Sequence, residues 1–327
     1  MPVKTMIEAV QEAIRQEMER DSRVMVLGED VGRKGGVFGA TRGLYDKFGG
    51  ERVLDTPLAE SVIVGSAIGM ALNGLRPIAE VQFADFIWPA ANQIISEAAR
   101  FRYRSNNTFS VPMVIRAPYG AGIHGGLYHS QSVEAFFAHV PGLVVITPSS
   151  PYDTKGLLIA AIRSEDPVLF LEHKKTYRML REEVPEAPYT VPIGKAKVIR
   201  EGRDLSVFSY GLSLLYAREA AETLAQDGID AEVVDLRTLR PLDTATILQS
   251  VRKTGKALVL HEDNQFGGFG AEVAALIAQG AFEYLDAPVM RQGGPEVPAA
   301  PYSKPLEEWW MPSPAKIADT MRQLAEY

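Results

Sequence analysis

Short apolar runs alternate along this chain with segments whose apolar residues recur every three or four positions. The runs are typical of buried strands, and the recurring segments are typical of amphipathic helices. Parallel strands need a crossover connection, which is usually a helix, so this alternation favours parallel pairing. We therefore expect an α/β fold with two open, mostly parallel sheets flanked by helices.

One interruption of the pattern predicts how the chain divides. Between Lys174 and Pro192, charged residues and prolines replace the alternation, which is typical of a linker. A chain of 327 residues is long enough for two domains of ordinary size. We expect an α/β domain over 1–180, a linker over 181–194 and a second α/β domain over 195–327.

The expected elements follow from the same periodicities. Thr5 and Glu8 form the capping-box pattern at the start of a first helix. Strands are expected at 24–27, 78–83, 113–116, 143–147, 168–171, 205–209, 231–235, 257–260 and 289–291. Helices are expected at 60–72, 90–104, 133–139, 152–163, 214–226, 244–251, 270–281 and 314–325.

Composition excludes several classes of function. The chain has 34 basic and 41 acidic residues and no long basic run, which argues against a nucleic-acid partner. It has no cysteine, so disulfides and thiolate catalysis are excluded. The uncharged run Ser61 to Leu75 is too short to span a bilayer, and the start of the chain lacks a signal-peptide pattern. We expect no membrane association and a cytoplasmic protein.

Glu60 and His129 are the candidates for proton handling. Glu60 opens an almost uncharged helix, although acids favour helix starts for structural reasons alone. His129 ends the glycine-rich loop from Pro118 to Tyr128, which follows an expected strand. Such loops are where open α/β sheets bind ligands, but a single histidine also serves as a packing or capping residue. Position alone leaves both the catalytic and the structural interpretation open.

Eight short motifs identify a family. They are Leu27-Gly28-Glu29-Asp30-Val31-Gly32, Gly35-Gly36-Val37-Phe38, Asp55-Thr56-Pro57-Leu58-Ala59-Glu60, Gly74-Leu75-Arg76-Pro77, Glu80-Val81-Gln82-Phe83-Ala84-Asp85-Phe86, Arg102-Tyr103-Arg104-Ser105, His129-Ser130-Gln131 and Asp235-Leu236-Arg237-Thr238. Together they closely resemble beta subunits of thiamine-diphosphate-dependent 2-oxo acid dehydrogenases, most of all the bacterial branched-chain type. The resemblance covers nearly the whole chain. It implies a transketolase-like pyrimidine-binding domain followed by a transketolase C-terminal-like domain.

The resemblance also implies a half-enzyme. In this family the beta subunit holds the aminopyrimidine ring of thiamine diphosphate, while a separate alpha subunit holds the diphosphate and magnesium. The sequence agrees, because it lacks the Gly-Asp-Gly start of a diphosphate and magnesium motif. A heterotetramer of two alpha and two beta subunits is implied. Its further partners would be a 2-oxo acid substrate and a dihydrolipoyl acyltransferase core with its lipoyl domain.

Residue roles are carried over by the same matching. Glu60 matches the acid that bonds a ring nitrogen of the aminopyrimidine, and His129 matches the histidine that serves acyl transfer to the lipoyl arm. Leu58, Gln82 and Phe86 would line the pyrimidine pocket. The resemblance also implies a structural potassium ion held near Met113, Val114, Ala161, Ser164 and Asp166, where Asp166 has a second interpretation as a turn residue.

The substrate is less well determined than the cofactor. Branched-chain members usually have tyrosine at the position of Phe86, whereas phenylalanine is familiar in pyruvate members. A branched-chain 2-oxo acid is the expected substrate, and pyruvate or acetoin dehydrogenase is the alternative. Two other classes stay open, a thiamine enzyme that needs no partner and a noncatalytic α/β binding module.

Overall fold

The computed structural model describes residues 1–327, which form two compact units. The first consists of residues 1–119 and 136–193, and the second of residues 120–135 and 194–327. The glycine-rich loop lies within the range of the expected first domain, 1–180, but it groups with the second unit. The first unit also continues to residue 193, through most of the expected linker.

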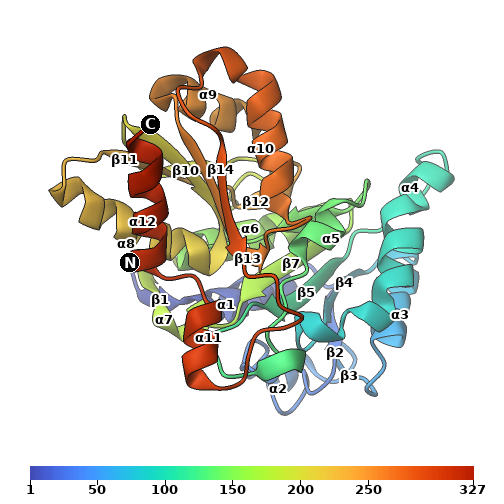
Figure 1. Ribbon diagram of the computed structural model, residues 1–327. Helices are drawn as coiled ribbons and strands as arrows, with labels where there is room; N and C mark the ends of the chain where they lie inside the picture. The colour runs from blue at the N-terminus through green and yellow to red at the C-terminus, as the bar shows by residue number, and fades with distance from the viewer. The chain divides into compact units, whose positions relative to one another are not determined.

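The first unit is a parallel sheet with helices packed on it (Figure 1). Its strands are β1 Val3–Thr5, β2 Val24–Gly28, β3 Val53–Asp55, β4 Arg76–Glu80, β5 Val114–Tyr119, β6 Val144–Ile146, β7 Val168–His173 and β8 Arg181–Glu183. The main sheet has the order β6-β7-β5-β4-β2-β3, and each of these pairs is parallel. The strands are almost entirely buried, as expected of a sheet covered on both faces.

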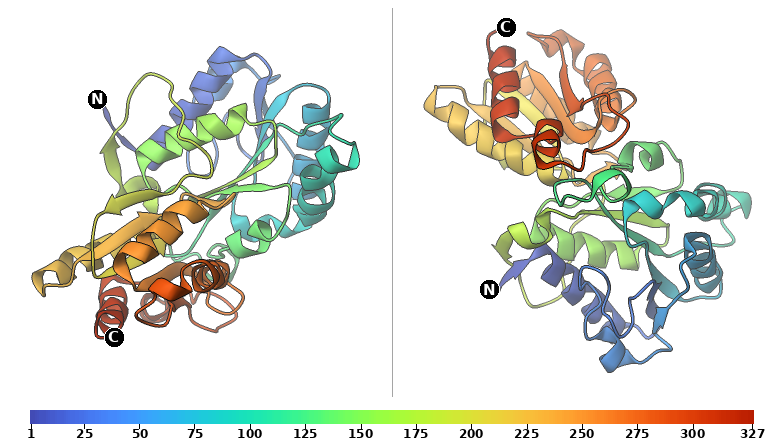
Figure 2. Two further views of the ribbon diagram at one scale, coloured as in Figure 1. Left: turned by 90° about the horizontal axis from the view of Figure 1, so that it is seen from above. Right: turned by 60° about the horizontal axis from the view of Figure 1, so that its bottom comes forward.

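The helices of this unit are mostly those that the periodicity predicts. They are α1 Met6–Arg20, α2 Leu44–Phe48, α3 Glu60–Leu72, α4 Phe101–Arg104, α6 Pro151–Arg163 and α7 Thr176–Met179. Helix α5, Glu134–Ala138, contains the boundary between residues 120–135 of the second unit and residues 136–193 of the first. The capping box of α1 is confirmed, because the Thr5 hydroxyl accepts from the Glu8 N–H and the Glu8 carboxylate accepts from the Thr5 N–H. Helices α1 and α6 share one apolar core with the sheet (Figure 2).

One expected helix of the first unit is wrong in detail. The single helix expected at 90–104 is instead broken into the 3₁₀ turn Trp88–Ala90, the π-helical turn Gln93–Glu97, the 3₁₀ turn Ala98–Arg100 and α4. At this break the chain passes so close to Gly142 that a Cβ there would lie 2.0 Å from the Ala99 carbonyl oxygen. Such packing is not visible in local periodicity.

The expected linker is also structured in part. It begins with β8, which pairs antiparallel with β1. The buried Lys155 ammonium donates to the carbonyls of Glu186 and Ala187 at 3.1 and 3.2 Å, which fixes the proline-rich stretch on the first unit.

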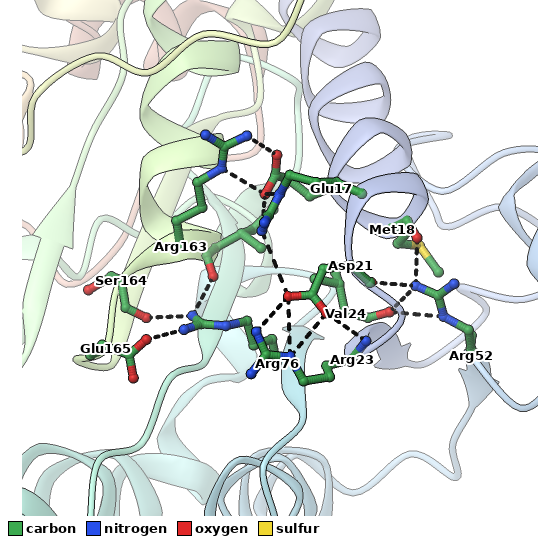
Figure 3. Close-up of polar contacts among 12 residues, drawn as sticks. Glu17, Met18, Asp21, Arg23, Val24, Arg52, Arg76, Arg163, Ser164 and Glu165 are labelled. Carbon is green, nitrogen blue, oxygen red and sulfur yellow. Dashed lines mark hydrogen bonds and ion pairs between the residues drawn. The ribbon is translucent and has the colours of Figure 1, made fainter.

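Arginine side chains form hydrogen bonds and ion pairs at the end of this unit where β2 and β4 begin (Figure 3). Arg52 donates to the carbonyls of Met18, Asp21 and Val24. Arg163, at the end of α6, pairs with the buried carboxylate of Glu17 on α1 at 2.7 Å. The bond to Met18 satisfies a carbonyl that α1 leaves free at its C-terminus, and the pair of Arg163 with Glu17 joins α1 to α6.

The second unit is the second predicted α/β sheet. Its strands are β9 Lys197–Arg200, β10 Leu205–Ser209, β11 Ala231–Asp235, β12 Thr238–Arg240, β13 Ala257–Asn264 and β14 Met290–Gly294. Its helices are α8 Gly211–Gln226, α9 Thr244–Thr254, α10 Phe269–Gly280, α11 Lys304–Trp310 and α12 Pro314–Ala325. The sheet has the order β14-β13-β10-β11-β9, with β9 antiparallel and the other pairs parallel.

Packing in the second unit follows the apolar pattern of its helices. Figures 1 and 2 show α8 and α12 side by side against the sheet, and their buried residues form one core with β10, β11 and β13. The expected α/β class, with two mostly parallel sheets, is therefore confirmed. No helix of the chain is both long and apolar enough to cross a membrane. The cytoplasmic location stays a prediction.

Candidate active site

Glu60 lies where three strands of the first unit end. It is the first residue of α3, which follows β3, and the neighbouring strands β2 and β4 end at Gly28 and Glu80. Carboxyl ends of parallel strands meet at one edge of a sheet, so the segments after them converge there. The Asp55 carboxylate at the end of β3 accepts from the Gly32 N–H at 2.6 Å, which holds the loop after β2 against the entry to α3.

The Glu60 carboxylate has no partner within the chain. The residue is 8% exposed, and it forms no hydrogen bond or ion pair with another residue. Its carboxylate oxygens are not among the fully buried polar atoms of the chain, so water reaches them and a ligand can replace that water. This carboxylate therefore fits the role of a ligand for a group that the chain does not supply, such as the ring nitrogen of an aminopyrimidine.

A second acid lies close to Glu60. Burial, and then the charges of Glu60 and Asp30, raise the pKa of Glu29 above its usual value. Desolvation and a like charge both favour the protonated form of a carboxyl group. Glu29 lies in one of the family motifs, but no feature of the sequence distinguishes it from a surface acid.

The three expected lining residues differ in their surroundings. Leu58 is 78% exposed, which is unusual for a leucine next to a buried acid. Gln82 is half-buried, with its amide nitrogen 3.5 Å from an Asp30 carboxylate oxygen. Phe86 is half-buried and meets Phe83 edge to face, with 5.6 Å between the ring centroids. An exposed apolar side chain beside these polar groups leaves a surface that a ring system could cover.

A buried charge network links strands β4, β5 and β7 of the same sheet. Arg116 on β5 is fully buried, forms two bonds of 2.6 Å to Glu172 on β7, and pairs with Glu80 on β4. The Tyr177 hydroxyl donates to the same Glu172 carboxylate. Burial raises the pKa of Glu80, and the two carboxylates raise the pKa of Arg116 against the effect of burial. Sequence reasoning missed this network, although each of its charges interrupts an apolar run.

His129 belongs to the second unit. It is half-buried and directly follows the 3₁₀ turn Gly126–Tyr128. Gly125 lies so close that a Cβ there would be 2.6 Å from the His129 Cβ, so the loop folds back tightly onto the histidine. Two buried carboxylates hold this loop: Glu262 accepts from the Ala121 N–H at 2.7 Å, and Glu307 accepts from the Gly122 N–H at 3.1 Å. The sequence gives no signal for either acid.

Acidic groups with raised pKa values lie at the other end of this loop. Glu134 is fully buried, and its carboxyl accepts from the Tyr210 hydroxyl at 2.9 Å. Burial, and then the charge of Asp263, raise the pKa of Glu134 well above its usual value. Burial likewise raises the pKa of Asp263 to about 6. These groups retain protons at a pH where most carboxyl groups are ionised.

The expected potassium ligands lie together, but arginines already bond some of them. Met113 precedes β5 and Val114 is its first residue. Ala161 lies in the last turn of α6, Ser164 is the C-cap of that helix, and Asp166 precedes β7. Arg76 donates to the Ser164 carbonyl at 2.9 Å (Figure 3), and Arg102 donates to the Asp166 carboxylate at 2.6 Å. The guanidinium groups would repel a bound cation. These positions therefore do not fit a potassium ion as they stand, and the ion stays a prediction.

Comparison with known proteins assigns the class first. Residues 3–179 match the family model described as transketolase, pyrimidine binding domain, and residues 194–317 match transketolase, C-terminal domain. A solved structure titled split gene transketolase, inactive beta4 tetramer, has the same fold, with a TM-score of 0.81 at 23% identity, and the match covers 99% of this chain and 98% of that one.

Relatives of higher identity define the family within this class. The chain is 59% identical to the 2-oxoisovalerate dehydrogenase subunit beta of Bacillus subtilis and 48% identical to the pyruvate dehydrogenase E1 component subunit beta of the same organism, over the full length of each. It is 47% identical to the pyruvate dehydrogenase E1 component subunit beta of Acholeplasma laidlawii, over 100% of this chain and 99% of that protein. The chain belongs to the family of 2-oxo acid dehydrogenase beta subunits.

Proposed function

We propose that this chain acts with a separate alpha subunit in the thiamine-diphosphate-dependent oxidative decarboxylation of a branched-chain 2-oxo acid and the reductive acylation of a lipoyl domain. The assembly would be a heterotetramer of two alpha and two beta subunits. The observation that carries the proposal is Glu60, a largely buried residue at the carboxyl edge of the first sheet whose carboxylate has no partner in the chain.

Thiamine diphosphate, when bound, would supply the carbon that attacks the 2-oxo acid, and it would accept the electron pair that remains when carbon dioxide leaves. Glu60 would bond a ring nitrogen of the aminopyrimidine and hold or release a proton there. Leu58 and Phe86 would exclude water from the ring, and Gln82 would offer its amide as a hydrogen-bond partner. These roles are supported by the position of all four residues on segments that follow β3 and β4.

His129 would act in the later half of the reaction. An imidazole can donate a proton near neutral pH, which suits the sulfur of a lipoyl group as its disulfide bond opens. The support for this role is the tight, carboxylate-anchored loop that fixes the histidine within the second unit. Magnesium, which the alpha subunit would hold, and docking on an acyltransferase core stay predictions of the family resemblance.

Pyruvate is the second candidate substrate. Phe86 favours it, because the family resemblance associates phenylalanine at this position with pyruvate members. Identities of 47–48% to pyruvate dehydrogenase subunits are consistent with shared machinery, whereas the relative at 59% identity is named for 2-oxoisovalerate. A branched-chain substrate is therefore preferred. A tetramer made with the cognate alpha subunit should turn over 2-oxoisovalerate at a higher kcat/KM than pyruvate, and the reverse order would reassign the substrate.

The test of the site is Glu60→Gln in this reconstituted tetramer. The amide has the shape of the acid but cannot give up or take a proton as a carboxyl group does, so assembly should persist while decarboxylation falls by about 10²–10⁴-fold. Assembly is measured by size-exclusion chromatography, and decarboxylation by carbon dioxide release. Glu51→Gln, at an exposed acid, is the matched control. Turnover of Glu60→Gln near that of the control would refute the role of Glu60.

A further inference from the structure

A short helix of the second unit supplies one of the two carboxylates that hold the glycine-rich loop that carries His129. Helix α11 presents Glu307, which is 3% exposed, toward the loop. One carboxylate oxygen accepts from the backbone N–H groups of Gly122 and His124, at 3.1 and 3.2 Å. The other lies 2.5 Å from Nδ1 of the His124 ring. Three donors of the loop thus converge on one buried carboxylate.

The loop conformation at this point needs support. His124 has φ +57°, in the left-handed region that side chains other than glycine rarely adopt. A residue in such a conformation persists when its surroundings hold it there. Glu307 bonds both the backbone and the ring of His124, and it is therefore the group that can hold this conformation.

Apolar contacts from residues 300–311, the segment that contains α11, also hold the loop. Ala121, at the start of the loop, is fully buried in a cluster with Ala300, Trp310 and Met311. The Tyr302 ring packs against Gly126, where a Cβ would lie 3.2 Å from the ring. The loop is therefore bonded at its first half and packed at both ends by residues 300–311.

The residues that Glu307 holds are connected to His129 through Gly125. Gly125 follows His124 immediately, and it lies so close to His129 that a Cβ there would be 2.7 Å from the His129 carbonyl oxygen. A shift of His124 would consequently be passed to the histidine. Displacements of about 1 Å in a catalytic group can cost on the order of 10²-fold in rate.

We propose that α11 is a clamp that sets the position of the His129 loop, with Glu307 as its positioning residue. The inference rests on the proposed role of His129 in lipoyl acylation. Glu307 itself touches neither substrate nor cofactor in this scheme. It acts through the backbone and ring of His124.

The test compares Glu307→Ala with Glu308→Ala in the reconstituted tetramer. Glu308 is the next residue of α11, its side chain is 65% exposed, and it makes only a surface ion pair, so it is a matched control. Amide hydrogen exchange over residues 121–129 should accelerate in Glu307→Ala alone. Turnover in lipoyl acylation should fall by about tenfold or more, while decarboxylation with an artificial electron acceptor and the KM for the lipoyl domain stay near wild type.

Two further variants distinguish loss of the clamp from misfolding. Glu307→Gln keeps an oxygen that can accept from both N–H groups, and it should restore most of the exchange protection and acylation. His124→Asn removes the ring but tolerates a positive φ, so exchange should rise less than in Glu307→Ala. These graded results would not arise from a general loss of stability.

The outcomes separate the clamp from the proposed function. Unchanged exchange in both Glu307→Ala and His124→Asn would overturn the clamp, whatever the activities. Faster exchange with normal acylation would overturn the positioning of His129 if His129→Ala abolishes acylation. If His129→Ala leaves acylation intact, the proposed role of His129 fails, while faster exchange in Glu307→Ala would still support the clamp on the loop.

Discussion

At the scale of single residues, Glu60 differs from the other buried acids because its carboxylate has no partner within the chain. Glu17, Glu172 and Glu307 are as buried as Glu60, but each of them accepts hydrogen bonds from named groups of the chain. Those three acids have their structural role visible in the fold. Glu60 has no such partner, which leaves its carboxylate available to the ligand that we propose.

His129 should separate the two halves of the reaction. We expect His129→Ala to leave thiamine diphosphate binding near wild type and to reduce lipoyl acylation by about 10²–10⁴-fold, because a positioned proton donor is lost. Decarboxylation with an artificial electron acceptor should fall much less. Both rates are measured on one preparation, with His139→Ala, at an exposed histidine, as the control. An equal loss in both assays would indicate a structural role instead.

His261 should make stability depend on pH. Burial lowers the pKa of this histidine from 6.5 to about 4, so the unfolded chain binds a proton there at a higher pH than the folded chain. Stability from this group is therefore full above pH 6.5 and is lost as the pH falls toward about 4, by about 3 kcal/mol in total.

The variant His261→Gln isolates this effect. The free energy of unfolding of wild type minus that of the variant should decrease between pH 6.5 and 4, as measured by urea unfolding at a series of pH values. Asp263, whose raised pKa gives a slope of opposite sign between its usual 3.8 and about 6, is present in both proteins, so the difference removes its contribution to a first approximation. A difference that does not vary with pH would contradict the prediction.

At the scale of elements, local signals set helix starts, while contacts from distant segments shape the rest. Helix α3 begins and ends at the residues that its periodicity predicts, Glu60 and Leu72. The expected helix at 90–104 is broken where Gly142 approaches the carbonyl of Ala99. These two residues are far apart in sequence, so no local pattern could place the break.

The capping box of α1 gives a local prediction. Thr5→Ala removes the hydroxyl that accepts from the Glu8 N–H, and the free energy of unfolding should fall by about 1 kcal/mol. Thr5→Ser keeps the acceptor and should stay within a few tenths of the wild-type value. Urea unfolding at pH 7 measures both. A loss in Thr5→Ser as large as that in Thr5→Ala would show that the methyl group, not the cap, is what matters.

At the scale of the whole molecule, a buried ion network centred on Arg116 links three strands of the first unit. Arg116 links Glu80 and Glu172, which lie on the strands to either side of it, and all three side chains are shielded from solvent. Removal of a single partner from a buried ion network leaves an uncompensated charge, which costs more than the network contributes as a whole. The three residues therefore act as one group in stability.

We expect Arg116→Met to lower the free energy of unfolding by about 3–5 kcal/mol. Adding Glu80→Gln and Glu172→Gln to the same chain should recover part of this loss, because no buried charge then lacks a partner. Arg104→Met, at an arginine whose side chain is 56% exposed, is the control. Urea unfolding compares the four proteins. A triple variant less stable than Arg116→Met would contradict this account of the network.

The sequence by itself determined the α/β class, most element positions and the family, because periodicity is local and the motifs stand in linear order. Through that resemblance it also predicts Glu60 and His129 as site residues. Only the tertiary structure decided that the His129 loop groups with the second unit, that Glu307 holds it, and that Arg116 is compensated by two strands. These features join residues distant in the chain, and their energies come from burial and hydrogen-bond geometry, which exist only once the chain has folded.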